Sequence, residues 1–312
     1  MATKTARKFR LVTRSDFDGL VSAILLREKK LIRDIHFVHP KDMQDGKIKI
    51  SDRDITTNLP YVEGVHLAFD HHPSEARRVG KRENYIMNPR APSASRVVYE
   101  HFGGESAFPE YTREMMTAVD KADSGRFTRN EIFRPKGWVL LNFLLDPRTG
   151  LGRFRNFRIT NEALMMSLID YCRHHPIKKV LKLYDLIERS GRYFVMSEMF
   201  MDQIVRCASV HGKTVVVDLR REDPILAGNR FMVYSLYSEC NMSVHLQRGI
   251  HGGKTEIAVG RSIFNRTSRC NVGRLMLKYG GGGHAAVGAC RVPDAEAGGI
   301  LEDLVRQISA AG

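Results

Sequence analysis

The sequence predicts an α/β protein of two domains, the first with a mainly parallel sheet. In the first half of the chain, short apolar runs alternate with segments of helical periodicity, as in a parallel sheet crossed by helices. A helical stretch at 161–211 interrupts the alternation, which resumes afterwards, and 312 residues suffice for two domains. We expect a first domain at 1–155, a helical connector at 156–211 and a second α/β domain at 212–312.

The first domain begins with an apolar run, FRLVT at 9–13, and the apolar-periodic segment Leu20–Lys30. We expect a strand, a turn and a helix here. Pro92-Ser-Ala-Ser supplies a serine cap for a helix that continues through Phe102. Further strands are expected at 35–38, 47–50, 54–59 and 65–69, and a further helix at 113–119.

The connector is expected to consist of two long helices that are broken at Pro176. After Gly212 the pattern changes to a mixture of strands and helices, which predicts a second α/β domain. The expected strands lie at 214–219, 231–236, 243–247 and 256–259, and the expected helices at 272–279 and 296–308.

The composition is that of a folded globular protein, with 43% hydrophobic and 27% charged residues. No apolar run approaches the roughly 20 residues that cross a bilayer. Met1–Arg10 is basic but lacks the apolar segment of a signal peptide, so we expect a cytoplasmic protein. The five cysteines form no CxxC pair, which argues against a disulfide frame or a structural zinc site. The net charge of +14 favours anionic partners.

Polar side chains are expected to gather where the strands of the first sheet end. Functional groups collect at the carboxyl ends of parallel strands, and the candidates there are Asp16, Asp18, Asn58 and Asp70. Asp16-Phe17-Asp18-Gly19 places two carboxylates at a strand-to-helix turn, and Gly19 permits the turn to be tight. The helix N-terminus behind them favours phosphate.

A mixed nitrogen and oxygen donor set follows another apolar strand, at Asp70-His71-His72. Such a set suits manganese, cobalt or zinc better than calcium. A second pair of carboxylates, Asp120 and Asp123, follows the next apolar helical segment.

Together these residues resemble the DHH phosphoesterases, whose name is the tripeptide at 70–72. The resemblance implies carboxylates and histidines around two divalent ions, usually Mn²⁺, with Mg²⁺ or Co²⁺ as alternatives. Two ions about 3.5–4 Å apart activate a water and neutralise charge on a phosphate. The metal ligands implied here are Asp16, Asp18, His71, Asp120 and Asn58. The catalytic residues implied are Asp16, Asp70 behind the ligands and His72 on the phosphate, and we add Arg14 as a catalytic candidate of our own for the reason given below.

The second domain resembles the DHHA1 domain of the same family through Gly280-Gly-Gly-Gly-His284. Consecutive glycines let backbone amides approach an anion closely. The substrate-binding residues that the resemblance implies are His284, Gly281, Gly282, Gly283, Arg261 and Asn265. Arg261 would pair with a terminal phosphate, and Phe264 and Tyr279 are candidates for stacking on a base.

Two positions depart from the family pattern. The family's first motif is His-x-Asp-x-Asp, and Arg14 stands here at the histidine, although a guanidinium cannot ligate a metal. Asn58 stands at the aspartate of the second motif and offers only a neutral oxygen. Asp54 lies about 13 Å away along an extended strand, whereas Asp42 or Asp45 could swing in. We expect Arg14 to hold a phosphate oxygen and to stabilise developing charge.

The resemblance implies a metal-dependent hydrolase of the nanoRNase or exopolyphosphatase-like branch. Its expected substrates are short oligonucleotides or small nucleotides, such as nanoRNA and 3′,5′-bisphosphorylated nucleosides. Two alternatives stay open, an exopolyphosphatase-like activity and a catalytically weak nucleotide-binding or regulatory protein with a degenerate metal site. A structural DNA-binding protein would leave the Asp, His and glycine signals unexplained. The sequence predicts no membrane partner and leaves open the preferred substrate, the number of metals and the formation of a homodimer.

Overall fold

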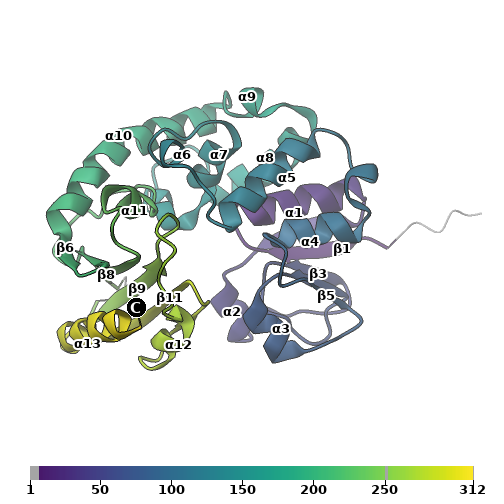
Figure 1. Cartoon of the computed structure of the whole chain (residues 1–312). Helices are drawn as coiled ribbons and strands as arrows, with labels where there is room; N and C mark the ends of the chain where they lie inside the picture. The colour runs from purple at the N-terminus through teal and green to yellow at the C-terminus, as the bar shows by residue number, and fades with distance from the viewer. Residues whose placement is uncertain (1–6, 250–251, 312) are drawn as a thin grey trace, which may run out of the picture. The chain divides into compact units, whose positions relative to one another are not determined.

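A computed structural model describes residues 7–249 and 252–311 and divides the chain into two compact units (Figure 1). Unit 1 comprises Met1–Phe127 and Arg134–Arg192, and unit 2 comprises Thr128–Phe133 and Tyr193–Gly312. The domain limits given above stay a prediction. The first part of the basic N-terminal segment, residues 1–6, lies outside the described residues. No helix among the described residues is long and apolar enough to cross a bilayer.

Unit 1 contains a sheet whose strands are all parallel to their neighbours, in the order β2-β1-β3-β4-β5. The strands are β1 (Phe9–Thr13), β2 (Ile32–Phe37), β3 (Asp54–Thr57), β4 (Leu67–Asp70) and β5 (Tyr85–Met87). The carboxyl ends of β1, β3 and β4 are therefore neighbours, which is the condition for a shared site at that edge.

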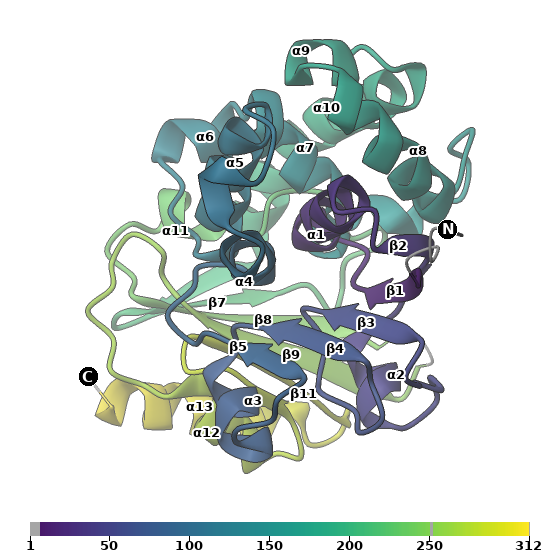
Figure 2. The ribbon, with the colours of Figure 1, turned by 90° about the vertical axis from the view of Figure 1, so that its right-hand side faces the viewer.

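Helices cover both faces of this sheet (Figure 2). Helix α1 (Phe17–Glu28) is buried on all sides from Phe17 to Leu26, as expected for a helix that is apolar all round. The helices packed against α1 are α4 (Ala94–His101), α5 (Thr112–Asp123), α7 (Gly137–Leu145) and α8 (Asn161–His174). The opposite face carries α2 (Pro40–Gln44) and α3 (Pro73–Val79), and the short α9 (Ile177–Val180) follows α8.

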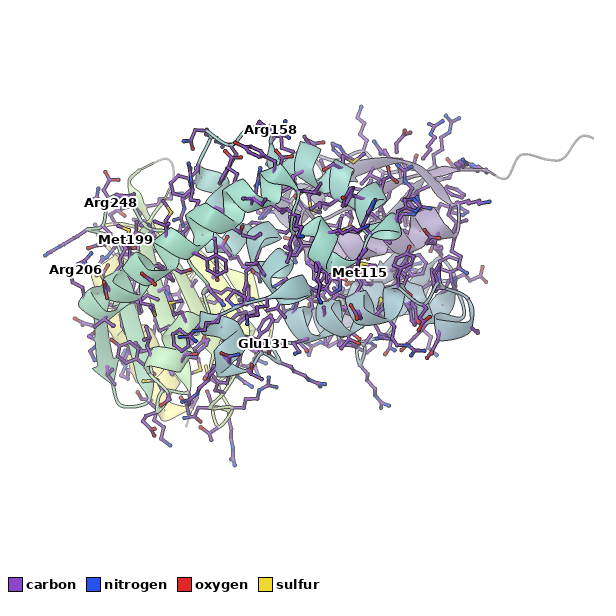
Figure 3. All side chains as sticks on the ribbon, turned by 90° about the horizontal axis from the view of Figure 1, so that it is seen from above. Met115, Glu131, Arg158, Met199, Arg206 and Arg248 are labelled. Atoms are coloured by element: carbon purple, nitrogen blue, oxygen red, sulfur yellow. The ribbon has the colours of Figure 1, made fainter. Side chains whose placement is uncertain are left out.

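Helix α10 (Tyr184–Cys207) leads into unit 2, and Met199 and Arg206 project from its outer side (Figure 3). The sheet of unit 2 has the order β10-β11-β9-β8-β7-β6, in which only β7 and β8 are paired in parallel. Its strands are β6 (Ala208–His211), β7 (Thr214–Asp218), β8 (Met242–Arg248), β9 (Lys254–Arg261), β10 (Gly282–Gly283) and β11 (Val287–Pro293).

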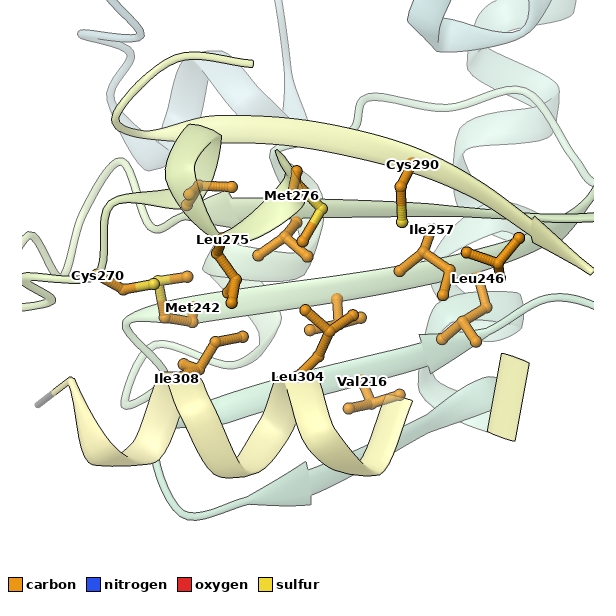
Figure 4. Packing of buried hydrophobic residues seen from close by; sticks show 14 of the residues in the cluster. Val216, Met242, Leu246, Ile257, Cys270, Leu275, Met276, Cys290, Leu304 and Ile308 are labelled. Atoms are coloured by element: carbon orange, nitrogen blue, oxygen red, sulfur yellow. The ribbon is translucent and has the colours of Figure 1, made fainter. Parts of the chain in front are cut away.

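One face of this second sheet forms the core of unit 2 with α12 (Val272–Leu277) and α13 (Ala297–Ala310) (Figure 4). Alternate residues of β8, such as Val244 and Leu246, point into this core because the side-chain period of a strand is two. Leu304 and Ile308 of α13 close it. The short helices α6 (Arg129–Phe133) and α11 (Met232–Leu236) pack on each other.

Two of the expected strands were wrong. Lys47–Ile50 forms no strand, and its apolar Ile48 and Ile50 instead pack on a small cluster with Met43. The expected strand at 231–236 is helix α11. The carbonyl of Asn229 accepts from Met232 N at 2.9 Å and its side chain accepts from Phe231 N, and this turn begins the helix. A short apolar run does not distinguish a buried helix from a strand.

Two boundaries also differ from the expectation. The end of the predicted helical connector, 208–211, is the edge strand β6. Helix α5 continues to Asp123, four residues beyond the predicted end at 119, so Asp120 and Asp123 both lie on its last turn. The second difference bears directly on the site.

Candidate metal centre and active site

Three side chains converge at the carboxyl edge of the first sheet. Asp18, His71 and Asp123 each offer a ligand atom, and these atoms all lie within 4.8 Å of one another. Asp18 comes from the first turn of α1, His71 follows β4, and Asp123 ends α5. Among the described residues this is the group that could hold a metal ion.

The turn that delivers Asp18 is fixed by its neighbours. Asp16 caps α1, because its Oδ1 accepts from Gly19 N at 3.0 Å. A Cβ atom at Gly19 would lie 1.9 Å from the carbonyl oxygen of Arg14, so only glycine fits there. Glycine thus allows the loop to close tightly over the start of α1, as the sequence predicts.

Asp18 is held by the N-terminus of α4. Its Oδ1 accepts from the backbone and the hydroxyl of Ser95 at 2.8 and 2.5 Å, and its Oδ2 accepts from Ala94 N at 3.1 Å. Burial, followed by the nearby charge of Asp123, raises the pKa of Asp18 to about 7. A buried carboxyl in such surroundings gains much from a cation, because the cation offsets the cost of its charge.

His71 is oriented for a ligand on its Nε2 atom. Its Nδ1 lies 3.1 Å from the carbonyl oxygen of Ala91, which fixes the ring and places the other nitrogen toward Asp123. Nε2 lies 3.0 Å from Asp123 Oδ2 but has no partner in hydrogen-bond geometry among the described residues. Two ligand atoms at right angles on one ion, each at about 2.1 Å, are also about 3 Å apart.

The electrostatics of this pair suit a cation beside them. Burial works against a proton on His71, but Asp123 outweighs it and raises the pKa of His71 to about 9. Partial burial works against ionisation of Asp123, yet His71, His72 and Arg14 lower the pKa of Asp123. Two carboxylate oxygens and one imidazole nitrogen within 4.8 Å of one another form a donor set that fits a divalent ion.

Asp70 supports the converging group from behind. It is fully buried, and its Oδ1 accepts from His71 N at 2.8 Å while its Oδ2 accepts from Tyr85 Oη at 3.1 Å. Nδ1 of His72 lies 2.6 Å from Asp70 Oδ1. Asp70 is not part of the converging group and instead orients both histidines.

Asp16 and Arg14 form an ion pair beside the converging group, with Nε of Arg14 at 3.1 Å from Oδ2 of Asp16. The side chain of Arg14 is 28% exposed and that of Asp16 is 13% exposed, so the pair borders solvent. The guanidinium therefore lies where the family pattern would have a metal-binding histidine.

Asn58 lies just past β3 in a left-handed conformation, with φ 56°. It is buried, and neither side-chain atom has a hydrogen-bond partner in the described parts of the chain. None of the alternative carboxylates takes its place. Asp54 binds Arg10 and Ser51, and Asp42 and Asp45 both bind lysines at the surface. A buried amide without a partner is uncommon, and it leaves the oxygen of Asn58 available to a ligand or a water.

Asp120 was expected among the metal ligands, but its carboxylate forms hydrogen bonds with residues of and next to α4. Its Oδ1 accepts from Ser93 Oγ at 2.8 Å, and its Oδ2 accepts from Arg96 Nε at 2.9 Å. It ties α5 to α4, and Asp123, one turn further on, stands in the converging group instead. Asp123 reaches the group because α5 continues beyond residue 119.

The charges of the site act on one residue that the sequence did not indicate. Arg148 follows α7 and binds Asp146, and Asp16 and Asp123 are among the charges that raise the pKa of Arg148. Asp-Pro-Arg in a loop carries no signal by itself, because its closeness to the site depends on how α7 packs.

In unit 2 the glycine-rich segment forms a compact turn onto β11. A Cβ at Gly281 would lie 2.2 Å from the oxygen of Ala289, and one at Gly283 would lie 2.3 Å from the oxygen of Val287. Gly282 faces open space. His284 donates its backbone N–H to Val287 O at 2.7 Å, and it is exposed. Glycines 281 and 283 are therefore required by backbone packing alone.

The other predicted substrate residues of unit 2 hold neighbouring backbone. Arg261 donates from Nε to Cys270 O at 2.7 Å, and Asn265 donates from Nδ2 to Glu239 O at 3.0 Å. Tyr279 packs on the core and its hydroxyl donates to Asp303 at 2.5 Å, so its ring is not placed for stacking on a base. Phe264 lies under the guanidinium of Arg129, 5.6 Å from the ring centre.

The fold of the chain matches that of a solved phosphodiesterase. The structure of PggH, a pGpG-specific phosphodiesterase from Vibrio cholerae, has a TM-score of 0.84 and 54% sequence identity with this chain. The match covers 98% of this chain and 100% of that one. The chain belongs to the DHH–DHHA1 phosphoesterase family. The family resemblance and the two-domain α/β class predicted from the sequence are thereby confirmed, and DHH–DHHA1 phosphoesterases are hydrolases.

Two RecJ structures share the DHH–DHHA1 fold at lower similarity. RecJ from Thermus thermophilus in complex with Mn²⁺ and exonuclease RecJ bound to manganese match with TM-scores of 0.57 and 0.54, both at 14% identity. The matches cover 99% of this chain, and 53% and 91% of the two RecJ chains. No family model matches the chain, and no curated protein sequence does.

Proposed function

We propose that this protein is a Mn²⁺-dependent phosphodiesterase that cleaves 5′-phosphorylated dinucleotides such as pGpG. The observation that carries the proposal is the 54% identity, over essentially the whole of both chains, with a pGpG-specific phosphodiesterase. The converging Asp18, His71 and Asp123 support it, because they form a donor set suited to a divalent ion.

The residues that would hold the ion are Asp18, His71 and Asp123, with the amide oxygen of Asn58 as a fourth ligand. A bound divalent ion would supply an activated water and would neutralise charge on the phosphate. Mg²⁺ and Co²⁺ are alternatives, because carboxylate and amide oxygens with one imidazole do not select strongly among these ions. Support for Asn58 comes from its buried, unpaired side chain.

The chain's own residues have the following roles. Asp70 fixes the turn at the end of β4 through its bonds to both histidines. His72, oriented by Asp70, lies beside the ion site and contacts the phosphate. Asp16 orients the water, and Arg14, held by Asp16, binds a phosphate oxygen and stabilises negative charge as it develops.

Unit 2 would bind the part of the substrate that lies away from the cleaved bond. His284 is exposed, and Gly282 leaves open space for the backbone to approach an anion. Arg261 and Asn265 are proposed to act in the same subsite, although in the structure both also hold neighbouring backbone. We assign the DHH domain to 1–155, the connector to 156–211 and the DHHA1 domain to 212–312.

The decisive experiment measures release of GMP from 5′-labelled pGpG, with Mn²⁺ and with chelator. The variant Asp18→Ala removes a ligand, and Asp34→Ala, an exposed aspartate of β2 that pairs with Arg33, is the matched control. We expect Mn²⁺-dependent cleavage that is lost in Asp18→Ala and unchanged in Asp34→Ala. Cleavage that persists in Asp18→Ala would refute the metal site.

A second candidate is a nucleotide-binding protein with little turnover. The replacement of two usual ligand positions by Arg14 and Asn58 favours it. Binding of pGpG without cleavage, in the presence of Mn²⁺, would select this candidate. Parallel reactions with a longer RNA, a 3′,5′-bisphosphorylated nucleoside and polyphosphate distinguish a dinucleotide phosphodiesterase from broader or exopolyphosphatase-like activities.

A further inference from the structure

Arg148 lies on the surface loop that follows α7, in the 3-10 turn η2 (Pro147–Thr149). Its guanidinium is clamped by Asp146, with Nε at 2.7 Å from Oδ1 and Nη2 at 2.9 Å from Oδ2. The backbone N–H of Arg148 donates to the same Oδ1 at 2.9 Å. Such a bidentate pair fixes the plane of the guanidinium as well as its position.

The ion pair with Asp146 leaves one side of the Arg148 guanidinium accessible. The side chain of Asp146 is 7% exposed, whereas that of Arg148 is 48% exposed. Within the described parts of the chain no acceptor binds the Nη1 amino group of Arg148. Arg148 is thus a rigidly held cation with an open side, which is the form that proteins use to bind phosphate.

The loop emerges beside the metal centre. Helix α7, which ends just before Asp146, packs against both α1 and α5, the helices that carry Asp18 and Asp123. Partial burial works against the charge of Arg148, but Asp146, followed by Asp16 and Asp123, outweighs it and raises the pKa of Arg148. Asp16 and Asp123 are therefore among the carboxylates whose charge acts on the guanidinium.

The same local clamp occurs once more in the described residues without such neighbours. In unit 2, Arg220 donates from Nε to Asp218 Oδ1 at 2.9 Å and from Nη2 to Oδ2 at 2.7 Å. The carboxylates that act on Arg220 are Asp218 and Asp294, and neither belongs to the metal centre. The Asp–Arg ion pair by itself therefore only stabilises a loop. Arg148 differs from Arg220 because the charges of Asp16 and Asp123 also act on it.

We propose that Arg148 binds the phosphate that is cleaved and that Asp146 is the residue that positions it. The proposal rests on the phosphodiesterase function proposed above. Arg148 and Arg14, each held by an aspartate two residues away, would together contact the non-bridging oxygens of the phosphodiester beside the ion. They would stabilise the negative charge that gathers on these oxygens as the bond to the leaving group breaks.

The test compares Arg148→Ala, Arg148→Lys and Asp146→Asn with Arg220→Ala as the matched control, on pGpG and on GpG. We expect Arg148→Ala to lower kcat/KM by about 10²–10³-fold on both dinucleotides, because both contain the cleaved phosphate. Arg148→Lys restores part of the rate, since it keeps the charge but loses the fork. Asp146→Asn lowers the rate about tenfold by releasing the guanidinium, and Arg220→Ala behaves like the wild type.

Mn²⁺ affinity, measured by titration calorimetry, separates this role from a structural one. The proposal requires that Arg148→Ala bind Mn²⁺ no more weakly than the wild type does. It is overturned if Arg148→Ala cleaves as fast as Arg220→Ala, if Mn²⁺ affinity falls in step with the rate, or if only pGpG is affected, since Arg148 would then bind the terminal phosphate. If the wild type cleaves a dinucleotide, each of these results refutes the role of Arg148 and leaves the proposed phosphodiesterase function intact. If the wild type cleaves neither dinucleotide, both the function and the role of Arg148 are refuted.

Discussion

At the scale of single residues, Asn58 combines two unusual features. Its positive φ is one that asparagine and aspartate adopt more readily than other residues with a side chain. Its buried amide lacks a hydrogen-bond partner in the described structure, which costs free energy unless a ligand takes that place. Both features are consistent with the proposed role of Asn58 as a ligand.

The first prediction concerns the charge at this position. Asn58→Asp keeps the backbone conformation and adds a formal negative charge, so we expect Mn²⁺ to bind about tenfold more tightly. Titration calorimetry measures the affinity. Asn58→Gly keeps the conformation without an oxygen and should bind more weakly than the wild type, and equal affinities in all three proteins would contradict a ligand role for Asn58.

His245 on β8 gives a prediction on pH. Burial, followed by the charge of Arg230, lowers the pKa of His245 to about 4 in the folded protein, whereas an unfolded histidine titrates near 6.5. Between these values the unfolded chain binds a proton that the folded chain does not. Stability is therefore lost as pH falls from about 6.5 toward 4.

We expect His245→Gln to flatten this part of the pH profile in urea denaturation. His211→Gln, at an exposed position of β6, is the control and should leave the profile unchanged. A wild-type profile that is already flat between pH 6.5 and 4 would show that His245 remains accessible to protons.

At the scale of elements, the glycine turn onto β11 separates packing from binding. Gly281→Ala and Gly283→Ala bring a Cβ against backbone oxygen, and Gly283 also has φ +151°, so each should lower the free energy of unfolding by about 1–3 kcal/mol or more. Gly282→Ala meets nothing and should stay within about 0.5 kcal/mol of the wild type. Thermal denaturation of the three variants is the measurement, and similar losses in all three would contradict it.

The placement of Asp18 and His71 in one site could be predicted from the sequence, because the ends of neighbouring parallel strands meet at one edge. The sequence did not show which aspartate of α5 joins the site. Asp120 and Asp123 both follow an apolar segment, and only the true length of the helix decides which one reaches the site. Helix ends are set by local capping and packing, which periodicity does not report.

Arg148 lay beyond prediction for a different reason. Asp146–Arg148 and Asp218–Arg220 are the same local motif, and only tertiary packing puts one of them beside two site carboxylates. The helix at 232–236 was missed because a short apolar run fits a strand equally well. The sequence thus revealed the groups that a motif fixes and missed those that packing brings in.

At the scale of the whole molecule, binding of the proposed ion would stabilise the folded state of unit 1. An ion that binds only the folded protein stabilises it, by about 2.7 kcal/mol at a concentration 100 times its Kd. We expect Mn²⁺ at that concentration to raise the unfolding temperature by roughly 5 °C or more. Differential scanning calorimetry checks this shift, which Asp34→Ala should retain and Asp18→Asn should lose. An unchanged temperature in the wild type would argue against a site for a divalent ion.

The buried carboxyl of Asp18 has a consequence for the life of the protein in a cell. Without the proposed ion this group would stay in surroundings that oppose its charge, and we expect unit 1 to open locally more often. Proteases cut open forms, so a shortage of manganese would shorten the lifetime of the molecule as well as slow its chemistry. The supply of the ion would then set how many copies persist.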